Sequence, residues 1–346
     1  MTGPPTAPTP PPAIVPPEVE EIARRRSEAR ALRDWATADI LRAEIEAAGW
    51  KVIDQGLRFR LELAHPPDIE IGGRIRYGAT ASVPSRLDDP PTARASVVLI
   101  ADRWPDDLAR ALDGLRTHAP EGTQVVIVAN DPTPEQAGAF DAPESPASRP
   151  IGGLVPEQVW TSAAMGHATA LNMGIRRTCG EVVVLLDTSI EPIGDIVTPL
   201  VEALRAPDVA VAGGWGLVSG DLRHFDDAAP GDVDAIEAYV LAFRQRDYVD
   251  RGPLDEHFRF YRNLDIWWSL VLRDEGSDAA PRRAVRVDLP GARHAHRGYS
   301  SLPEHERDRL SRRNFYRIID RFGSRRDLLL KPTARRPPGV GSEEPG

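Results

Sequence analysis

Apolar runs and helix-like spacing alternate along most of the chain. Continuous apolar runs such as 182–186 and 124–128 are typical of strands buried on both faces. The leucine spacing in 104–118 predicts an amphipathic helix between two such strands. This alternation predicts an α/β fold with a doubly wound, mainly parallel sheet. The expected strands are 96–100, 124–128, 159–160, 182–186 and 209–211, and the expected helices are 104–118, 163–177, 198–204 and 303–322.

The run 182–186 is the best candidate for the central strand, and Asp187 follows it directly. Open α/β sheets bind ligands in the crevice outside the carboxyl ends of their strands. We therefore expect Asp187 to face a binding site. Pro192 stands where a following helix is expected to begin.

A smaller unit is expected before the sheet. Two helices, 18–33 and 35–48, precede a β-hairpin at 50–63, with Asp34 as N-cap of the second helix and Gly49 at its end. The expected boundaries are a disordered proline-rich tail at 1–17, the helical-hairpin plus β-hairpin module at 18–63, a linker at 64–94, the sheet domain at 95–331 and a disordered tail at 332–346.

Composition narrows the class of protein. The net charge is −9 over 346 residues, so no overall positive field attracts nucleic acid or an anionic membrane. Cys179 is the single cysteine, which excludes a disulfide framework and a cysteine zinc site. No apolar run approaches the length of a membrane span, and no signal-peptide pattern begins the sequence. These features predict a soluble, cytoplasmic protein.

The N-terminal unit carries a recognisable pattern. Its residues Arg26-Ser-Glu-Ala-Arg30, Asp34-Trp-Ala-Thr-Ala-Asp39, Arg42, Glu44, Gly49 and Asp54-Gln-Gly56 resemble the C-terminal module of cysteinyl-tRNA synthetases. In that family the module helps to hold tRNA, which implies that Arg26, Arg30 and Arg33 meet phosphates from one helical face. The alternative is a solvated basic face. The synthetase's catalytic domain and zinc ligands are absent from the sequence, so aminoacylation is not expected.

The sheet domain lacks the glycine motifs that usually mark a nucleotide site. Neither G-x-G-x-x-G after the first strand nor G-x-x-x-x-G-K-[ST] is present. The remaining possibility is a diphosphate that a divalent cation links to a carboxylate at a strand end. Four ordered blocks resemble glycosyltransferases of family 2, which have the GT-A fold. The blocks are Gly166-His-Ala-Thr-Ala-Leu-Asn-Met-Gly174, Gly180-Glu-Val-Val-Val-Leu-Leu-Asp-Thr-Ser189, Gly252-Pro-Leu-Asp-Glu-His-Phe-Arg-Phe-Tyr-Arg-Asn-Leu-Asp265 and His296-Arg-Gly-Tyr-Ser300.

This resemblance implies an inverting transferase that moves a hexosyl group from a nucleotide-sugar to an acceptor, either a glycan, a lipid-linked compound or a small molecule. It also implies a divalent metal, Mn²⁺ or Mg²⁺, held by Asp187 and His296. The catalytic base that accepts the acceptor's proton is predicted to be Asp265, with Asp255 and Glu256 as alternatives. The residues expected to bind the donor are Asp102, Asn130, Asp131, Gly166, Asn172, Asp187 and Ser189.

Several of these positions have structural alternatives. Asn172 also suits a helix-packing amide, and Asp265 suits a carboxylate held by backbone donors near a helix start. His294 and His296 would point to the same side of an extended backbone, which favours their acting together as ligands.

The chain also departs from the family pattern. The second acid of the D-x-D motif is Ser189, Ala129 stands where an aspartate usually begins the acidic turn, and Arg262-Asn263 replaces an acidic pair. These losses support a second hypothesis, a catalytically weakened GT-A domain that serves as a binding or scaffold module, with RNA contact through the N-terminal unit. Nucleic acid is otherwise not an expected partner.

The closing helix 303–322 carries an arginine stripe opposite its apolar face. This stripe is either a solvated face or a surface for an anionic acceptor or a peripheral membrane contact. Its members are Arg309, Arg313, Arg317 and Arg321.

Overall fold

The computed structural model describes residues 14–55, 58–101, 103–142 and 145–332. It divides into two compact units, Met1–Ile69 and Glu70–Gly346. Asp102, most of the proline-rich tail and the C-terminal tail from residue 333 lie outside the described residues. Within the described ranges, no helix combines the length and the apolar character that crossing a lipid bilayer requires.

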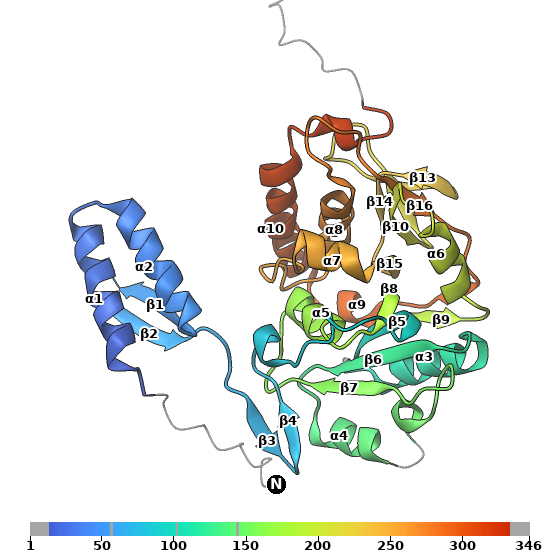
Figure 1. Cartoon of the computed structure of the whole chain (residues 1–346), viewed down its shortest axis with the longest axis horizontal. Coiled ribbons are helices and arrows are strands. Elements are labelled where there is room, and N and C mark those ends of the chain that lie inside the picture. The colour runs from blue at the N-terminus through green and yellow to red at the C-terminus, as the bar shows by residue number, and fades with distance from the viewer. Residues whose placement is uncertain (1–13, 56–57, 102, 143–144, 333–346) are drawn as a thin grey trace, which may run out of the picture. The chain divides into compact units, whose positions relative to one another are not determined.

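The first unit is two helices followed by a β-hairpin, as the sequence predicts (Figure 1). The helices are α1 (Pro17–Ala31) and α2 (Trp35–Ala47), and β1 (Trp50–Gln55) pairs with β2 (Arg58–Leu63) in antiparallel register. Asp34 caps α2 by accepting a hydrogen bond from the Thr37 N–H at 3.1 Å. Gly49 has a φ of +80°, a left-handed conformation that favours glycine after a helix. The buried apolar side chains are Val19, Ala23, Ile45 and Trp50.

The arginine face of α1 is partly used inside the first unit. Arg26 is buried, and its guanidinium donates to both carboxylate oxygens of Asp54, at 2.9 and 3.1 Å. Arg30 reaches the same carboxylate at 3.5 Å, and Arg33 lies beyond the end of α1 with a φ of +60°. The expectation that the three arginines share one phosphate-binding face is therefore wrong, because the hairpin supplies a carboxylate partner for Arg26.

The segment expected as a linker, 64–94, contains further secondary structure. It includes β3 (Ile69–Ile71), β4 (Arg74–Arg76), the short 3₁₀ helix η1 (Thr80–Ser82) and the start of β5 (Ala93–Ala101). Most of this segment belongs to the second unit, where Arg74 lies over the Trp160 ring and Val83 is fully buried. The expected linker would be solvated, whereas Arg74 and Val83 of this segment pack against the second unit.

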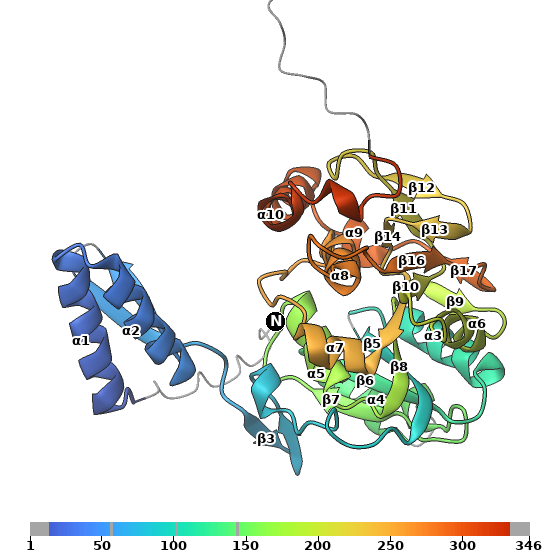
Figure 2. The same ribbon diagram turned by 45° about the horizontal axis from the view of Figure 1, so that its top comes forward.

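The second unit is built on one eight-stranded sheet. Six of its strands run in one direction, and β13 and β15 run in the opposite direction, so the sheet is mainly parallel as the sequence predicts. Figures 1 and 2 show β8 and β5 in the middle of this unit. In spatial order the strands are β13 (Gly231–Val233), β16 (Arg283–Arg286), β10 (Val209–Gly213), β15 (Val240–Arg244), β8 (Gly180–Leu186), β5 (Ala93–Ala101), β6 (Thr123–Ala129) and β7 (Glu157–Trp160).

Helices cover both faces of the sheet, which makes the fold a doubly wound α/β structure. One core contains side chains of α5, α7, α8 and α10, and the other contains side chains of α3, α4 and α6. In β8, Val183 and Leu185 point into the first core and Val182, Val184 and Leu186 into the second. The helices are α3 (Pro105–His118), α4 (Pro134–Asp141), α5 (His167–Ile175), α6 (Val197–Ala203), α7 (Gln245–Arg251), α8 (Leu264–Arg273), α9 (Arg297–Ser300) and α10 (Glu304–Phe322).

Two details of the second unit differ from expectation. Pro192 does not begin a helix, because it ends β9 (Ile190–Pro192), which pairs with β17 (Gly291–Arg293) and carries the chain away before α6. The arginine stripe of α10 is also not wholly solvated. Arg317 pairs with Asp255 at 2.6 Å, and Arg321 lies over the Trp267 ring. A small three-stranded sheet of β12 (Asp226–Ala228), β11 (Gly216–Val218) and β14 (Ala235–Ile236) completes the unit.

Candidate functional site

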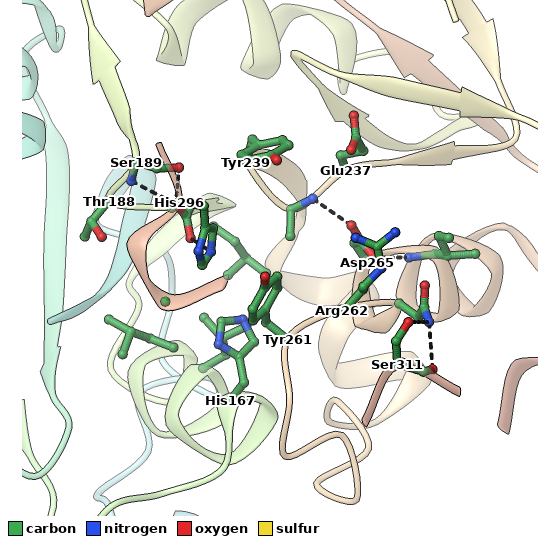
Figure 3. A pocket seen from close by; sticks show the side chains of 18 of the residues that line it. His167, Thr188, Ser189, Glu237, Tyr239, Tyr261, Arg262, Asp265, His296 and Ser311 are labelled. Atoms are coloured by element: carbon green, nitrogen blue, oxygen red, sulfur yellow. Dashed lines mark hydrogen bonds and ion pairs between the residues drawn. The ribbon is translucent and has the colours of Figure 1, made fainter. Parts of the chain in front are cut away.

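A cavity of about 500 Å³ lies at the carboxyl end of β8 in the second unit. Its walls come from the start of α5, the connection between β14 and β15, the loop before α8, the turn before α9, and α10. Figure 3 shows the labelled side chains that face it. The cavity is at the place that the sheet topology predicts for a ligand.

Asp187 and Ser189 form a tight turn directly after β8. Asp187 Oδ1 accepts hydrogen bonds from the Ser189 N–H at 2.8 Å and from the Ser189 hydroxyl. Ser189 lines the cavity, but it is buried and its hydroxyl is directed to Asp187. Ser189, which stands where the D-x-D motif has its second aspartate, thus orients the carboxylate of Asp187.

His296 completes this side of the cavity. Its Nε2 lies 3.3 Å from Asp187 Oδ2, and its ring stacks on Tyr261 with a centroid distance of 4.5 Å. His294 instead contacts Glu191 at 2.7 Å and does not line the cavity. The expectation that both histidines act together is wrong, because β17 ends at Arg293 and the backbone beyond it is no longer a strand.

The surroundings hold Asp187 ionised and His167 neutral. Burial raises the pKa of Asp187, but the hydrogen bond and charge of His296, with the two Ser189 donors, outweigh burial and lower it below its usual value. Burial lowers the pKa of His167 to about 4, although the nearby charge of Asp187 acts in the opposite direction. At neutral pH His167 is therefore an uncharged imidazole, and it meets the edge of Tyr261 in a T-shaped contact.

Two carboxylates lie in another part of the cavity wall. Asp265, in the first turn of α8, accepts hydrogen bonds from the N–H groups of Ala238 at 3.1 Å and Ile266 at 2.9 Å. Burial raises its pKa despite these donors. Burial, and then the charges of Asp265 and Asp227, raise the pKa of Glu237 to about 7. The wall therefore holds two coupled acids, one of which titrates near neutrality.

Asp255 and Glu256, the alternative bases, do not line the cavity. Asp255 is engaged by Arg317 at 2.6 Å and His257 at 2.7 Å. Glu256 accepts a hydrogen bond from Thr80 at 2.5 Å. Both side chains connect structural elements of the second unit.

Asn172 is a packing amide rather than a cavity residue. It is fully buried, its oxygen accepts from the Leu254 N–H and the Tyr248 hydroxyl, both at 3.0 Å, and its nitrogen donates to the Leu254 carbonyl at 2.9 Å. These bonds join α5 to the segment after α7. Because Asn172 does not line the cavity, the structure supports its packing role and not the binding of a donor.

Asn130, Asp131 and Gly166, the other predicted donor residues that the structure describes, also lie outside the cavity lining. Asn130 accepts a hydrogen bond from the Met165 N–H at 2.8 Å, and Asp131 has a φ of +50° in the turn after β6. Gly166 precedes α5, and a Cβ there would lie 3.0 Å from the backbone of Arg259. This close approach explains why the position suits glycine.

Sequence reasoning assigned no role to Glu237, Tyr239, Tyr261 or His167, all of which line the cavity. His167 and Tyr261 lie inside the recognised blocks, so the blocks could have indicated them. Glu237 and Tyr239 lie in the connection between two short strands, where no local motif marks them.

The residues present fit a divalent ion only in part. Among the described residues, no group of three or more histidine, cysteine, aspartate and glutamate side chains is arranged to hold a metal ion. Asp187 and His296 offer one carboxylate and one imidazole, so phosphate oxygens and water would have to supply the other ligands.

Two of the solved structures that are similar to this chain are glycosyltransferases. GalNAc-T7, solved with UDP, GalNAc and Mn²⁺, is similar with a TM-score of 0.48 and 11% identity, over 67% of this chain and 48% of that protein. The mannosyltransferase PcManGT from Pyrobaculum calidifontis, solved with GDP-Man and Mn²⁺, is similar with a TM-score of 0.47 and 17% identity, over 71% of each chain.

Comparison of sequences finds a different relationship for the N-terminal part. Over 58 residues the chain is 50% identical to a cysteine–tRNA ligase of Opitutus terrae. The match spans 17% of this chain and only 13% of the ligase. No protein-family model matches the chain. The resemblance of the N-terminal segment to a cysteinyl-tRNA synthetase is thereby confirmed at the level of sequence.

Proposed function

We propose that this protein is an inverting glycosyltransferase of the family 2 type, which transfers a sugar from a nucleotide-sugar to an acceptor hydroxyl. One observation carries the proposal: each of the four sequence blocks contributes a side chain to the same cavity. These side chains are His167, Asp187, Asp265 and His296. Blocks so far apart in the chain have no packing reason to present polar groups to one space, whereas a shared substrate gives them one.

The donor's diphosphate belongs at the Asp187 side in this proposal. An ionised carboxylate repels a diphosphate, so the two need a cation or basic groups between them. Asp187 and His296 are the residues that would hold Mn²⁺ or Mg²⁺, and the bound ion would stabilise the charge of the leaving diphosphate. Ser189 orients the carboxylate that faces the ion.

The transfer itself is assigned to Asp265. The acceptor oxygen forms a bond to the anomeric carbon as the bond from that carbon to the diphosphate oxygen breaks, and the nucleoside diphosphate leaves with the electron pair. The Asp265 carboxylate takes the proton of the acceptor hydroxyl. Its raised pKa suits this role, because a base with a pKa nearer to neutrality holds the proton more firmly.

The test is an assay of the full chain with UDP- and GDP-sugars, with Mn²⁺ or Mg²⁺, in which release of nucleoside diphosphate is measured. Sugar transfer or slow donor hydrolysis that Asp187→Asn abolishes is the expected result. Absence of both activities, together with no calorimetric binding of UDP or GDP, overturns the proposal.

The second candidate is a catalytically weakened domain that binds ligands without transfer. The single carboxylate at the end of β8 favours it, as does the short ligand set for a metal. In this case the N-terminal unit, with its likeness to a tRNA ligase segment, would contact RNA. Binding of nucleoside diphosphate without turnover supports this candidate, and a salt-sensitive gel shift with tRNA tests its RNA part.

A further inference from the structure

Arginines from separate segments converge on the cavity that holds the proposed active site. Arg223 comes from the loop between β11 and β12, Arg262 from the loop before α8, and Arg312 from α10. Arg297, the first residue of α9, also lines the cavity, and it pairs with Asp107 at 3.5 Å. Four separate segments thus each bring a guanidinium group to one cavity.

Arg223 and Arg312 differ from most arginines of the chain in their contacts. Both residues are exposed at the cavity, and neither side chain forms an ion pair or a hydrogen bond with any described residue, although Asp227 and Glu237 line the same cavity. Elsewhere in the second unit, Arg317 is paired with a carboxylate at 2.6 Å. A guanidinium group is a planar donor that matches carboxylate and phosphate oxygens, so arginines without a protein partner in a cavity indicate an anionic ligand.

Arg262 lies away from the proposed diphosphate site, whereas Arg297 directly follows His296. In Figure 3, Arg262 and Ser311 lie beside Asp265, while Ser189 and His296 lie across the cavity. Arg312 directly follows Ser311 on α10. An anion bound by Arg312 would therefore lie next to the carboxylate assigned as base, which is where the acceptor must bring its hydroxyl.

We propose that the acceptor is a small hydroxyl compound that carries a phosphate or a carboxylate, and that Arg223 and Arg312 bind this anionic group. The inference rests on the proposed function, because it identifies the second substrate of the same cavity. A cavity of about 500 Å³ is within the size range of small-molecule sites. The anionic group takes no part in bond making; it fixes the acceptor so that its hydroxyl lies between Asp265 and the sugar.

The test titrates inorganic phosphate and, separately, acetate into the full chain by calorimetry, in the presence of saturating UDP or GDP. The proteins are the wild type, the double variant Arg223→Gln/Arg312→Gln, and the control Arg313→Gln, an exposed neighbour on α10 that does not line the cavity. We expect at least one anion to bind the wild type and the control equally, and the double variant at least tenfold more weakly. The anion that binds more tightly identifies the acceptor's charged group.

Absence of phosphate and acetate binding, or equal binding by the double variant, overturns the inference. Calorimetric binding of UDP or GDP distinguishes failure of this inference from failure of the proposed function. If UDP and GDP bind and neither anion does, only the anionic acceptor is wrong. If neither nucleotide binds, the transferase proposal is wrong, and titration of the anions alone still decides whether the two arginines form a binding site.

Discussion

Asp187 Oδ2 and His296 Nε2 lie 3.3 Å apart, although Asp187 directly follows the central strand β8 and His296 precedes α9. The histidine is held by its stacking on Tyr261, and the aspartate by the donors of Ser189. The pair lowers the pKa of Asp187 in spite of its burial. One cavity wall therefore carries a fixed negative charge with an imidazole beside it.

Replacing His296 by alanine removes the partner that keeps Asp187 ionised. We expect His296→Ala to raise the pKa of Asp187 and to weaken the binding of UDP or GDP with Mn²⁺ about tenfold, which corresponds to about 1.4 kcal/mol. Calorimetric titration measures the change. His294→Ala is the matched control, because His294 contacts Glu191 outside the cavity and should leave affinity unchanged. Equal effects of the two variants contradict the assignment.

The short ligand set predicts that metal and nucleotide bind together. With one carboxylate and one imidazole, Asp187 and His296 should bind Mn²⁺ alone only weakly, whereas the diphosphate oxygens of UDP or GDP complete its coordination. Titration of Mn²⁺ followed by its electron paramagnetic resonance signal should show binding at least tenfold tighter when the nucleotide is present. Tight binding of Mn²⁺ without nucleotide would contradict this prediction.

Replacing the proposed base separates catalysis from structure. Asp265→Asn keeps the size of the side chain but cannot take the acceptor's proton, so turnover should fall on the order of 10²- to 10⁴-fold while nucleotide binding stays the same. Steady-state assay and calorimetry measure the two quantities. Asp255→Asn is the control, since Asp255 pairs with Arg317 outside the cavity; it should lower stability and leave turnover unchanged. A normal rate for Asp265→Asn removes it as the base.

The local sequence predicts the central strands well because their burial is continuous. Each apolar residue of β8 packs against one of two cores, so the run itself identifies the strand. The antiparallel β15 was not predicted. Its direction depends on β14 and on the loops around it, and the apolar run alone carries no information about strand direction.

The site was harder to predict than the fold, for a geometric reason. Asp255, Glu256 and Asp265 lie in one sequence block, and their spacing does not tell which of them faces the cavity. The answer depends on where α8 begins and on the contacts of Arg317, both of which come from tertiary packing. Glu237 acquires its raised pKa from burial and from Asp265, neither of which is visible in its sequence neighbours.

Asn172 should matter for stability rather than for binding. Asn172→Ala leaves the Leu254 N–H and carbonyl and the Tyr248 hydroxyl without their partner in the buried core. The cost of such unsatisfied groups is on the order of 2–3 kcal/mol in the free energy of unfolding. Urea denaturation measures this loss, and calorimetry with UDP or GDP on the folded variant should show unchanged affinity. A variant of normal stability that no longer binds nucleotide contradicts the packing role.

The raised pKa of Glu237 predicts that the protein becomes less stable as the pH rises. Its pKa in the folded protein is about 7, above the ordinary 4.5, so the folded state keeps a proton that the unfolded state has released. The stability associated with this group is present below pH 4.5 and is lost as the pH rises to about 7. Glu237→Gln removes that loss, which is at most about 3.5 kcal/mol at about 1.4 kcal/mol per pKa unit and is smaller because solvent screens this half-buried side chain. The melting temperature of the variant, relative to the wild type, should therefore be higher at pH 8 than at pH 5.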